Sequence, residues 1–208
     1  MRGVDERLEL VATVLLALAT VGTAWSGYQA SRWNGEQAKA SARASAARIE
    51  SAKAAGTANA QKQVDVAVFT AWADAYAQDQ AKLAAFYFAR FRKEFRPAAE
   101  AWIATRPLQN PRAPLTPFAM PQYRLAAEGE ATALEAKAER LAAQARVDVQ
   151  RSTNYVLAVV LFATVLFFAG MSTKLSVPAL RRVLLGFGVV VFVGTLLWIV
   201  TSPVNVSI

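Results

Sequence analysis

The sequence predicts an all-α membrane protein, with three transmembrane helices and a long-helix extramembrane bundle inserted between the first and the second. Three apolar runs almost free of charge carry this prediction: Leu8–Ala24, Tyr155–Met171 and Val183–Val200. Each is close to the ~20 residues that an α-helix needs to cross the hydrocarbon core of a bilayer. The segment between the first two runs is charged and alanine-rich with a helical pattern, which indicates a polar domain outside the bilayer.

We predict three parts in this 208-residue chain. Residues 1–30 form an N-terminal transmembrane helix, and residues 31–152 form an extracytoplasmic helical domain. Residues 153–208 form a transmembrane hairpin, with spans at about 154–172 and 182–201.

The first span has two interpretations. Gly22 and Ala24 have the small-residue spacing of a signal-peptide cleavage site. Acidic residues precede the span, however, and the helical pattern continues through the supposed cleavage site. We therefore predict an uncleaved signal anchor.

Composition excludes several kinds of chemistry. The chain contains no Cys and no His, which removes disulfides, thiolate nucleophiles, the commonest general base and most zinc sites. Carboxylates such as Asp74, Asp79, Glu94 and Glu100 remain, but on helices they more often form ion pairs with neighbouring cations. We predict no enzymatic activity, no metal site and no cofactor.

The net charge is +8, which favours contact with anionic lipid headgroups or an acidic partner. The basic residues are spread among acids and alanines rather than gathered on one stripe. That distribution argues against a nucleic-acid partner. Membrane lipid and further copies or other membrane subunits are the predicted partners.

Charges flanking the spans predict the orientation. Arg2 and Arg7 precede the first span, and three cations lie in the short connection between the second and third, namely Lys174, Arg181 and Arg182. By the positive-inside rule, the N-terminus and the hairpin turn face the cytoplasm of a bacterial inner membrane, and residues 31–152 lie outside. Arg32, Lys39 and Arg43, just after the first span, oppose this assignment.

Aromatic residues lie where the predicted spans meet water. Rings with one polar edge are typical of membrane interfaces. The predicted interface anchors are Trp25, Tyr28, Trp33, Tyr155 and Trp198.

The stretch Trp25–Trp33, with the span before it, resembles a segment of small uncharacterised prokaryotic three-span membrane proteins. This resemblance implies no activity. A binding site built on Tyr28, Gln29 and Arg32 is the alternative use of the stretch.

Small side chains recur along the first helix at alternating spacings of four and three. They include Ala17, Thr20, Ala24, Gly27 and Ser31. Such a row lets another helix approach closely, as in coiled coils and small-residue seams of membrane helices. Chance in an alanine-rich chain is the competing explanation.

A break near Gly56-Thr57 is expected to end the first helix, and a second helix is expected from about Gln63 to Arg96. Its aromatic face includes Trp72, Phe86 and Phe95, and must be covered. We predict that this face forms the domain core; a subunit interface and a ligand pocket are the alternatives.

The end of that second helix is basic. If it folds back antiparallel to the first helix, it returns to the membrane surface, where its cations contact anionic lipid. The predicted contacts are Arg90, Arg92, Lys93 and Arg96. Cations that simply complement the helix dipole are the alternative.

Five prolines between Pro107 and Pro121 predict an extended loop over residues 106–121, which contains no acid. It is either a connector or a contact for a partner. A third helix is expected from about Gln122, continuous into the second span, because no Pro or Gly interrupts Glu130–Phe168.

These observations favour a non-enzymatic membrane scaffold or interaction protein that presents a helical stalk, as an oligomer or as a subunit of a membrane complex. The alternative is an oligomeric ion channel with a pore between subunits. The spans contain essentially no ionisable residue, which is unlike ion pathways within one chain.

Overall fold

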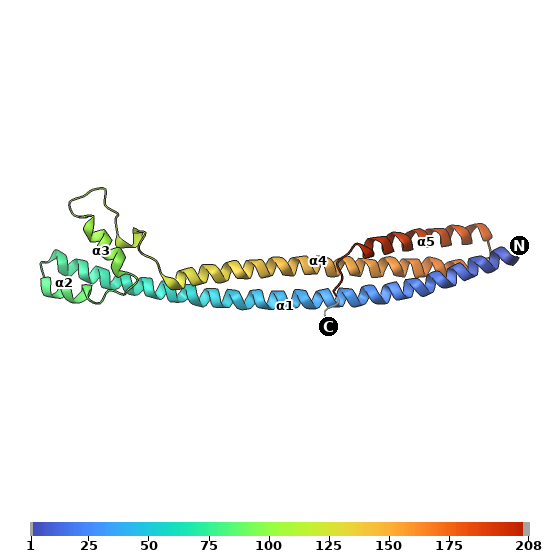
Figure 1. Ribbon diagram of the computed structural model, residues 1–208, viewed down its shortest axis with the longest axis horizontal. Coiled ribbons are helices and arrows are strands. Elements are labelled where there is room, and N and C mark those ends of the chain that lie inside the picture. The colour runs from blue at the N-terminus through green and yellow to red at the C-terminus, as the bar shows by residue number, and fades with distance from the viewer. Residues whose placement is uncertain (1, 206–208) are drawn as a thin grey trace. The chain divides into compact units, whose positions relative to one another are not determined.

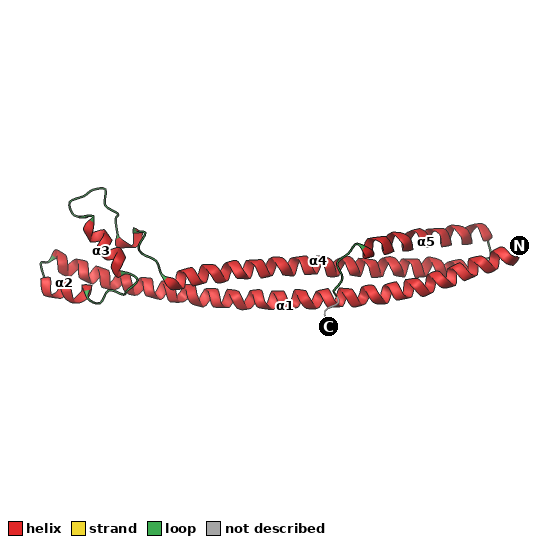
Figure 2. Ribbon diagram, in the orientation of Figure 1, coloured by secondary structure: helices red, strands yellow, loops and turns green. Residues whose placement is uncertain are grey.

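The structure is a computed structural model that describes residues 2–205, most of them helical (Figures 1 and 2). The elements in chain order are α1 (Arg2–Ala77), α2 (Ala81–Phe88), α3 (Arg96–Ala104), the 3₁₀ helix η1 (Pro117–Ala119), α4 (Ala126–Lys174) and α5 (Pro178–Val200). No strand occurs among the described residues. The predicted all-α class is therefore confirmed.

The chain divides into two compact units. Unit 1 contains Met1–Ala42 and Leu141–Ile208, and unit 2 contains Arg43–Arg140. Helices α1 and α4 contribute to both units. Helix α5 belongs to unit 1, whereas α2, α3 and η1 belong to unit 2, which falls inside the predicted domain of residues 31–152.

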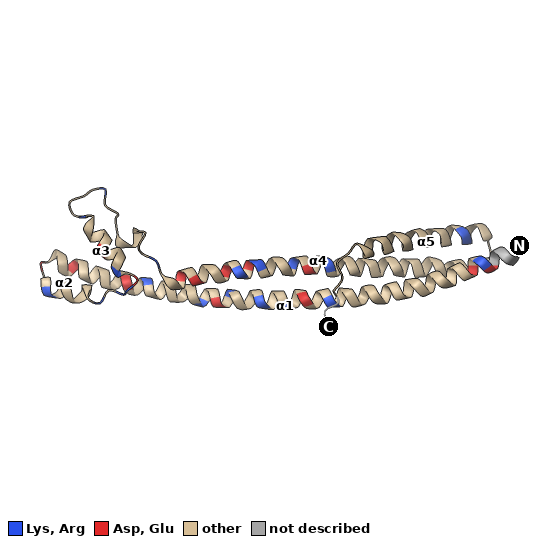
Figure 3. Cartoon of the chain, in the orientation of Figure 1, with Lys and Arg blue, Asp and Glu red and all other residues tan. Residues whose placement is uncertain are grey.

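Helices α1, α4 and α5 each contain a stretch long and apolar enough to cross a membrane. Only 17%, 28% and 22% of the residues in these stretches, in that order, are buried within the chain. The outward faces carry large apolar side chains, such as Val21, Phe167 and Val190, and the stretches are uncharged ribbon in Figure 3. Such a surface needs apolar surroundings, as in a multi-pass membrane protein.

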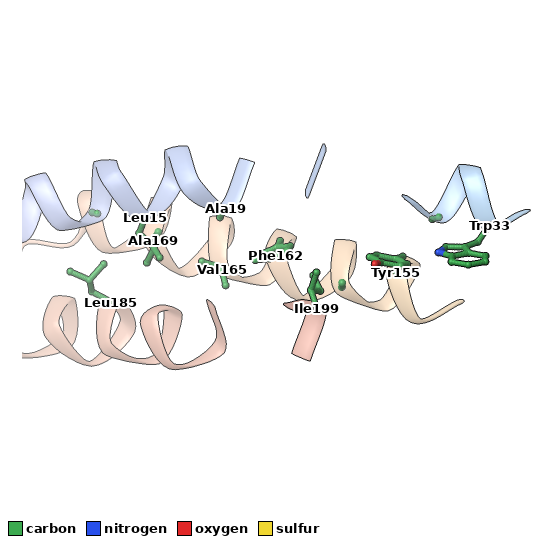
Figure 4. Close-up of a cluster of buried hydrophobic side chains, with 12 residues drawn as sticks. Leu15, Ala19, Trp33, Tyr155, Phe162, Val165, Ala169, Leu185 and Ile199 are labelled. Carbon is green, nitrogen blue, oxygen red and sulfur yellow. The ribbon is translucent and has the colours of Figure 1, made fainter. Parts of the chain in front are cut away.

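The core of unit 1 packs α1, α4 and α5 together, with both small and large side chains contributed by α1 and α4 (Figure 4). Gly22 has the closest approach: a Cβ added there would lie 2.7 Å from the ring of Phe162. The ring is itself only 1% exposed, so it has little room to move. The buried members of this core are Ala12, Leu15, Ala19, Ala30, Trp33, Tyr155, Ala158, Phe162, Val165, Ala169, Leu185 and Ile199.

The predicted small-residue seam does not form the internal contact face of α1. Its members, Ala17, Thr20, Ala24, Gly27 and Ser31, are all exposed. A second row with the same alternating spacing is buried instead, including Ala12, Leu15 and Ala19. Gly22 continues the buried row and lies against the ring of Phe162 in α4, so complementarity of shape favours this face, and smallness alone does not select it.

Helix α1 continues through the break predicted at Gly56-Thr57, so that prediction is wrong. A glycine inside a helix costs about 1 kcal/mol relative to alanine. Packing on the opposite face offsets this cost, because Ala54 and Ala58 are buried there. On the same face, the Ser51 hydroxyl donates a 2.9 Å hydrogen bond to the carbonyl of Ala131 in α4.

The predicted helix from Gln63 to Arg96 is also wrong, because α1 ends at Ala77. Asp79 adopts a left-handed conformation with φ of 56°, and the Gln80 amide donates to the Ala75 carbonyl at 2.9 Å. Together these features form a Schellman cap. Aspartate tolerates this conformation better than most residues, so the turn forms without a glycine.

The remaining helices agree with the sequence more closely. Helix α4 is continuous from Ala126 to Lys174, as predicted, although it begins four residues after the expected start at Gln122. Pro178 lies in the first turn of α5, where its missing N–H group has no cost. The turn between α4 and α5 therefore covers residues 175–177.

Two glycines of α1 provide a matched test of the packing face. We expect Gly22→Ala to lower the free energy of unfolding by about 1–3 kcal/mol, because the new methyl group overlaps Phe162. Gly27→Ala is the control, since a Cβ at Gly27 meets nothing within 4 Å. Thermal unfolding of both variants in detergent measures the difference; equal midpoints would contradict this packing.

Candidate functional site

The polar centre of unit 2 is the carboxylate of Asp65, which is 1% exposed and lies in the interior of α1. Its Oδ2 accepts hydrogen bonds from Arg92 Nη1 at 2.9 Å and from the Tyr123 hydroxyl at 3.0 Å. Arg92 lies between α2 and α3, and Tyr123 lies between η1 and α4. One buried side chain of α1 therefore holds two separate connections.

Glu94 extends this network to the start of α4. One oxygen of its carboxylate pairs with Arg92 Nη2, and the other accepts the backbone N–H of Ala126 at 3.0 Å. Ala126 is the first residue of α4, where the N–H groups have no partner within the helix. Glu94 therefore caps α4, and its charge complements the helix dipole.

Aromatic rings surround this network and form the core of unit 2. Phe95 is fully buried against the rings of Phe118 and Tyr123, with centroids 5.1 and 5.8 Å away. Trp102 Nε1 donates to the carbonyl of Pro114 at 2.6 Å, which fixes the proline loop to α3. The aromatic surface predicted from the sequence is therefore core, although Phe86 remains 47% exposed.

Burial dominates the electrostatics of the network. It raises the pKa of Asp65 above its usual range, although hydrogen bonding to Tyr123 and the charge of Arg92 partly oppose this. The second oxygen, Oδ1, has no hydrogen-bond partner among the described residues. Burial, and then the hydrogen bond to Asp65, raise the pKa of Tyr123 as well.

The four cations predicted to contact lipid lie in and around the connection between α2 and α3. Arg92 is engaged by Asp65 and Glu94, and Arg90 lies over the Phe86 ring. Arg96 lies 3.6 Å from Glu100, and Lys93 is exposed. The single long helix on which the lipid contact depended is absent from the described residues. Lipid contact at these positions stays a prediction.

A second polar network lies in unit 1, where the segment after α5 folds against α1 and α4. The Gln29 amide forms two hydrogen bonds with the backbone of Asn205, at 2.9 and 3.3 Å. The carbonyl of Pro203 accepts from Trp33 Nε1 at 3.2 Å and from the Tyr155 hydroxyl at 3.1 Å. Three side chains therefore bind the backbone of this tail.

This network changes the role of two predicted interface anchors. Trp33 and Tyr155 are buried, with their polar atoms directed at the tail. Trp198 packs partly buried against the core of unit 1, whereas Trp25 and Tyr28 are exposed, as an interface position requires. The alternative of a binding site on Tyr28, Gln29 and Arg32 loses one member, because Gln29 is fully buried against the tail.

Asp65 and Tyr123 were not predicted from the sequence as site residues, although the spacing of residues along α1 indicates that Asp65 is buried. Ala58, Asp65 and Trp72 follow one another at intervals of seven on the buried face of α1. An acidic residue on such a face requires a buried partner. Among the carboxylates that the sequence did single out, Asp74 and Asp79 are exposed, and only Glu94 joins the network.

No group of three Asp or Glu residues within the described range 2–205 is placed to hold a metal ion. No protein-family model, curated protein or solved structure matches the chain. The resemblance of Trp25–Trp33 to small prokaryotic membrane proteins therefore stays a prediction.

The raised pKa of Asp65 predicts a particular pH dependence. Asp65→Asn cannot ionise, whereas the wild type acquires a buried charge as pH rises through the pKa of Asp65 in the folded state. The wild type should therefore lose stability relative to this variant as pH rises above about 4, the usual range of an Asp carboxyl, and through the raised pKa of Asp65.

Thermal unfolding of both proteins across that pH range measures the effect. Asp74→Asn, an exposed position on the same helix, is the control. A difference between wild type and Asp65→Asn that does not change with pH, or that grows in the opposite direction, would contradict the electrostatic account.

Proposed function

We propose that this chain is a non-enzymatic integral membrane scaffold or interaction protein that presents unit 2 as a helical stalk. It acts as an oligomer or as a subunit of a membrane complex. The observation that carries the proposal is that the charged groups of unit 2 bind within the fold. Arg92 pairs with Asp65 and with Glu94. Asp65 also binds Tyr123, and Glu94 binds the start of α4.

Catalytic acids and bases must be able to reach a substrate. In unit 2, Asp65 binds Arg92 and Tyr123, which lie in two connections between helices. Glu94 binds the first residue of α4. This arrangement supports a rigid presenting domain, because it uses charge to fix the loops. The apolar outward faces of α1, α4 and α5 support insertion in a membrane.

A channel is the second candidate, and a pore would have to form between copies. The interior of unit 1 contains apolar side chains such as Phe162, Val165 and Leu185. The hydroxyls of Thr13, Thr20 and Thr23 donate to carbonyls of the preceding turn of α1. Their protons are therefore already engaged, so these hydroxyls have no donor left for an anion.

The favoured orientation places the turn between α4 and α5 in the cytoplasm and unit 2 outside. Lys174 ends α4, and Arg181 and Arg182 lie in the first turns of α5, so three cations gather at one short connection. A charge cluster of this kind on a short loop resists translocation.

The solution mass of the chain in detergent, together with ion flux through liposomes that contain it, distinguishes the scaffold from the channel. We expect a defined oligomer, or a complex with another membrane subunit, and no flux above that of empty liposomes. A larger ring that conducts ions would replace the scaffold proposal with the channel.

The orientation is testable because the natural chain has no Cys. We expect Ser176→Cys to be protected from an impermeant thiol reagent in intact cells and Gln109→Cys to be labelled. Both side chains are exposed, so burial does not confound the result. The neighbouring Asn110 is avoided because its side-chain amide forms hydrogen bonds within the loop, which a cysteine would remove. The reverse labelling pattern would invert the topology.

A further inference from the structure

The connection between α3 and η1 carries two leucines with an unusual degree of exposure. Leu108 is 85% and Leu115 is 95% exposed, more than every other large hydrophobic side chain that the structure describes. A single exposed leucine is common on protein surfaces. Two such residues on one loop, each more exposed than the side chains of the apolar helices, need a further explanation.

The loop is held in one shape rather than left free. The Trp102 indole holds the carbonyl of Pro114 at 2.6 Å, and the Asn110 amide donates to the Thr105 carbonyl at 3.3 Å. Asn110 Oδ1 also accepts the N–H of Arg112 at 3.0 Å. Prolines at 107, 111 and 114 restrict the backbone further. The leucines are therefore displayed by a preorganised segment, which lowers the entropic cost of binding.

The charged side chains of the same loop are all basic. No acidic residue occurs from 101 to 127, whereas Arg106 precedes Leu108 and Arg112 lies between the two leucines. Both arginines are exposed, and neither forms an ion pair within the described part of the chain. The combination of exposed leucine and unpaired arginine complements a surface that is apolar beneath and anionic at its boundary.

We propose that the loop of residues 105–116 binds the surface of a bilayer that contains anionic lipid. Leu108 and Leu115 enter the headgroup region, and Arg106 and Arg112 bind lipid phosphates. A bilayer is the favoured partner because a fluid surface accepts a protruding loop without a matching groove. The anionic headgroups supply the opposite charge with which Arg106 and Arg112 can pair.

This inference rests on the proposed function in one respect, that unit 2 faces water, where it can meet such a surface. The test uses the full chain in nanodiscs of phosphatidylcholine. These are mixed with sedimenting vesicles of phosphatidylcholine, with or without about 30% phosphatidylglycerol. The measurement is the fraction of nanodiscs that sediment with the vesicles as lipid concentration rises.

We expect the wild type to bind the anionic vesicles and to leave the neutral vesicles unbound. Leu108→Ser with Leu115→Ser, and separately Arg106→Gln with Arg112→Gln, should each weaken binding by about tenfold or more. The matched control alters exposed residues of α1 in unit 2: Ile49→Ser, Val64→Ser, Arg48→Gln and Lys62→Gln. This control should retain most of the binding, because it lies outside the loop.

Equal binding by the loop variants and the wild type would overturn the inference, as would a control that loses as much as they do. Absence of wild-type binding would also overturn it and would redirect the search to an acidic protein partner. Circular dichroism and the solution mass of every nanodisc sample show whether each variant is folded and assembled. An intact, non-conducting sample that does not bind vesicles would reject the loop inference and leave the scaffold proposal standing.

Discussion

Close approach of α1 and α4 within each unit is the constraint on which the rest of the structure depends. In unit 2, the short side chain of Ser51 reaches the backbone carbonyl of Ala131, which requires the two backbones to lie close together. In unit 1, the Ser152 hydroxyl reaches the carbonyl of Ala30 at 3.0 Å in the same way. Alanine recurs among the buried residues of α1 and α4 in both units, where close van der Waals contacts contribute to stability. Larger side chains at these positions would separate the helices.

An alanine-lined contact of this kind gives little resistance to sliding, because small side chains form shallow ridges and grooves. The pair of buried Asp65 and partly exposed Arg92 adds a directional contact at one defined position on α1. Its value lies in specifying one arrangement, since the cost of burying the Asp65 charge offsets much of the attraction. Glu94 joins this pair to the first residue of α4, so one network fixes the connection between α2 and α3 and also the start of the returning helix.

The sequence predicts the parts of this fold that depend on long, uniform patterns. The spans and the continuous α4 follow from uncharged length and from the absence of prolines. The break at Gly56 was wrong because tertiary packing exceeds the small cost of one glycine in a helix. The end of α1 was missed because its signal is the conformation of Asp79, for which the sequence offers no glycine or proline. Asp65 was missed because only its position on the buried face of α1 indicates a partner.

The tail of unit 1 explains why the aromatic stretch of α1 contains amide and indole donors as well as rings. Helix α5 ends at Val200, and the following backbone groups lose the partners that a helix would supply. Near an apolar environment, each such group is costly to leave without a hydrogen bond. Gln29, Trp33 and Tyr155 supply these partners to Pro203 and Asn205. Trp33 and Tyr155 are of residue types typical of a membrane interface, yet here they donate to a backbone carbonyl. Composition cannot separate this role from anchoring, because the polar edge of the ring can serve either one.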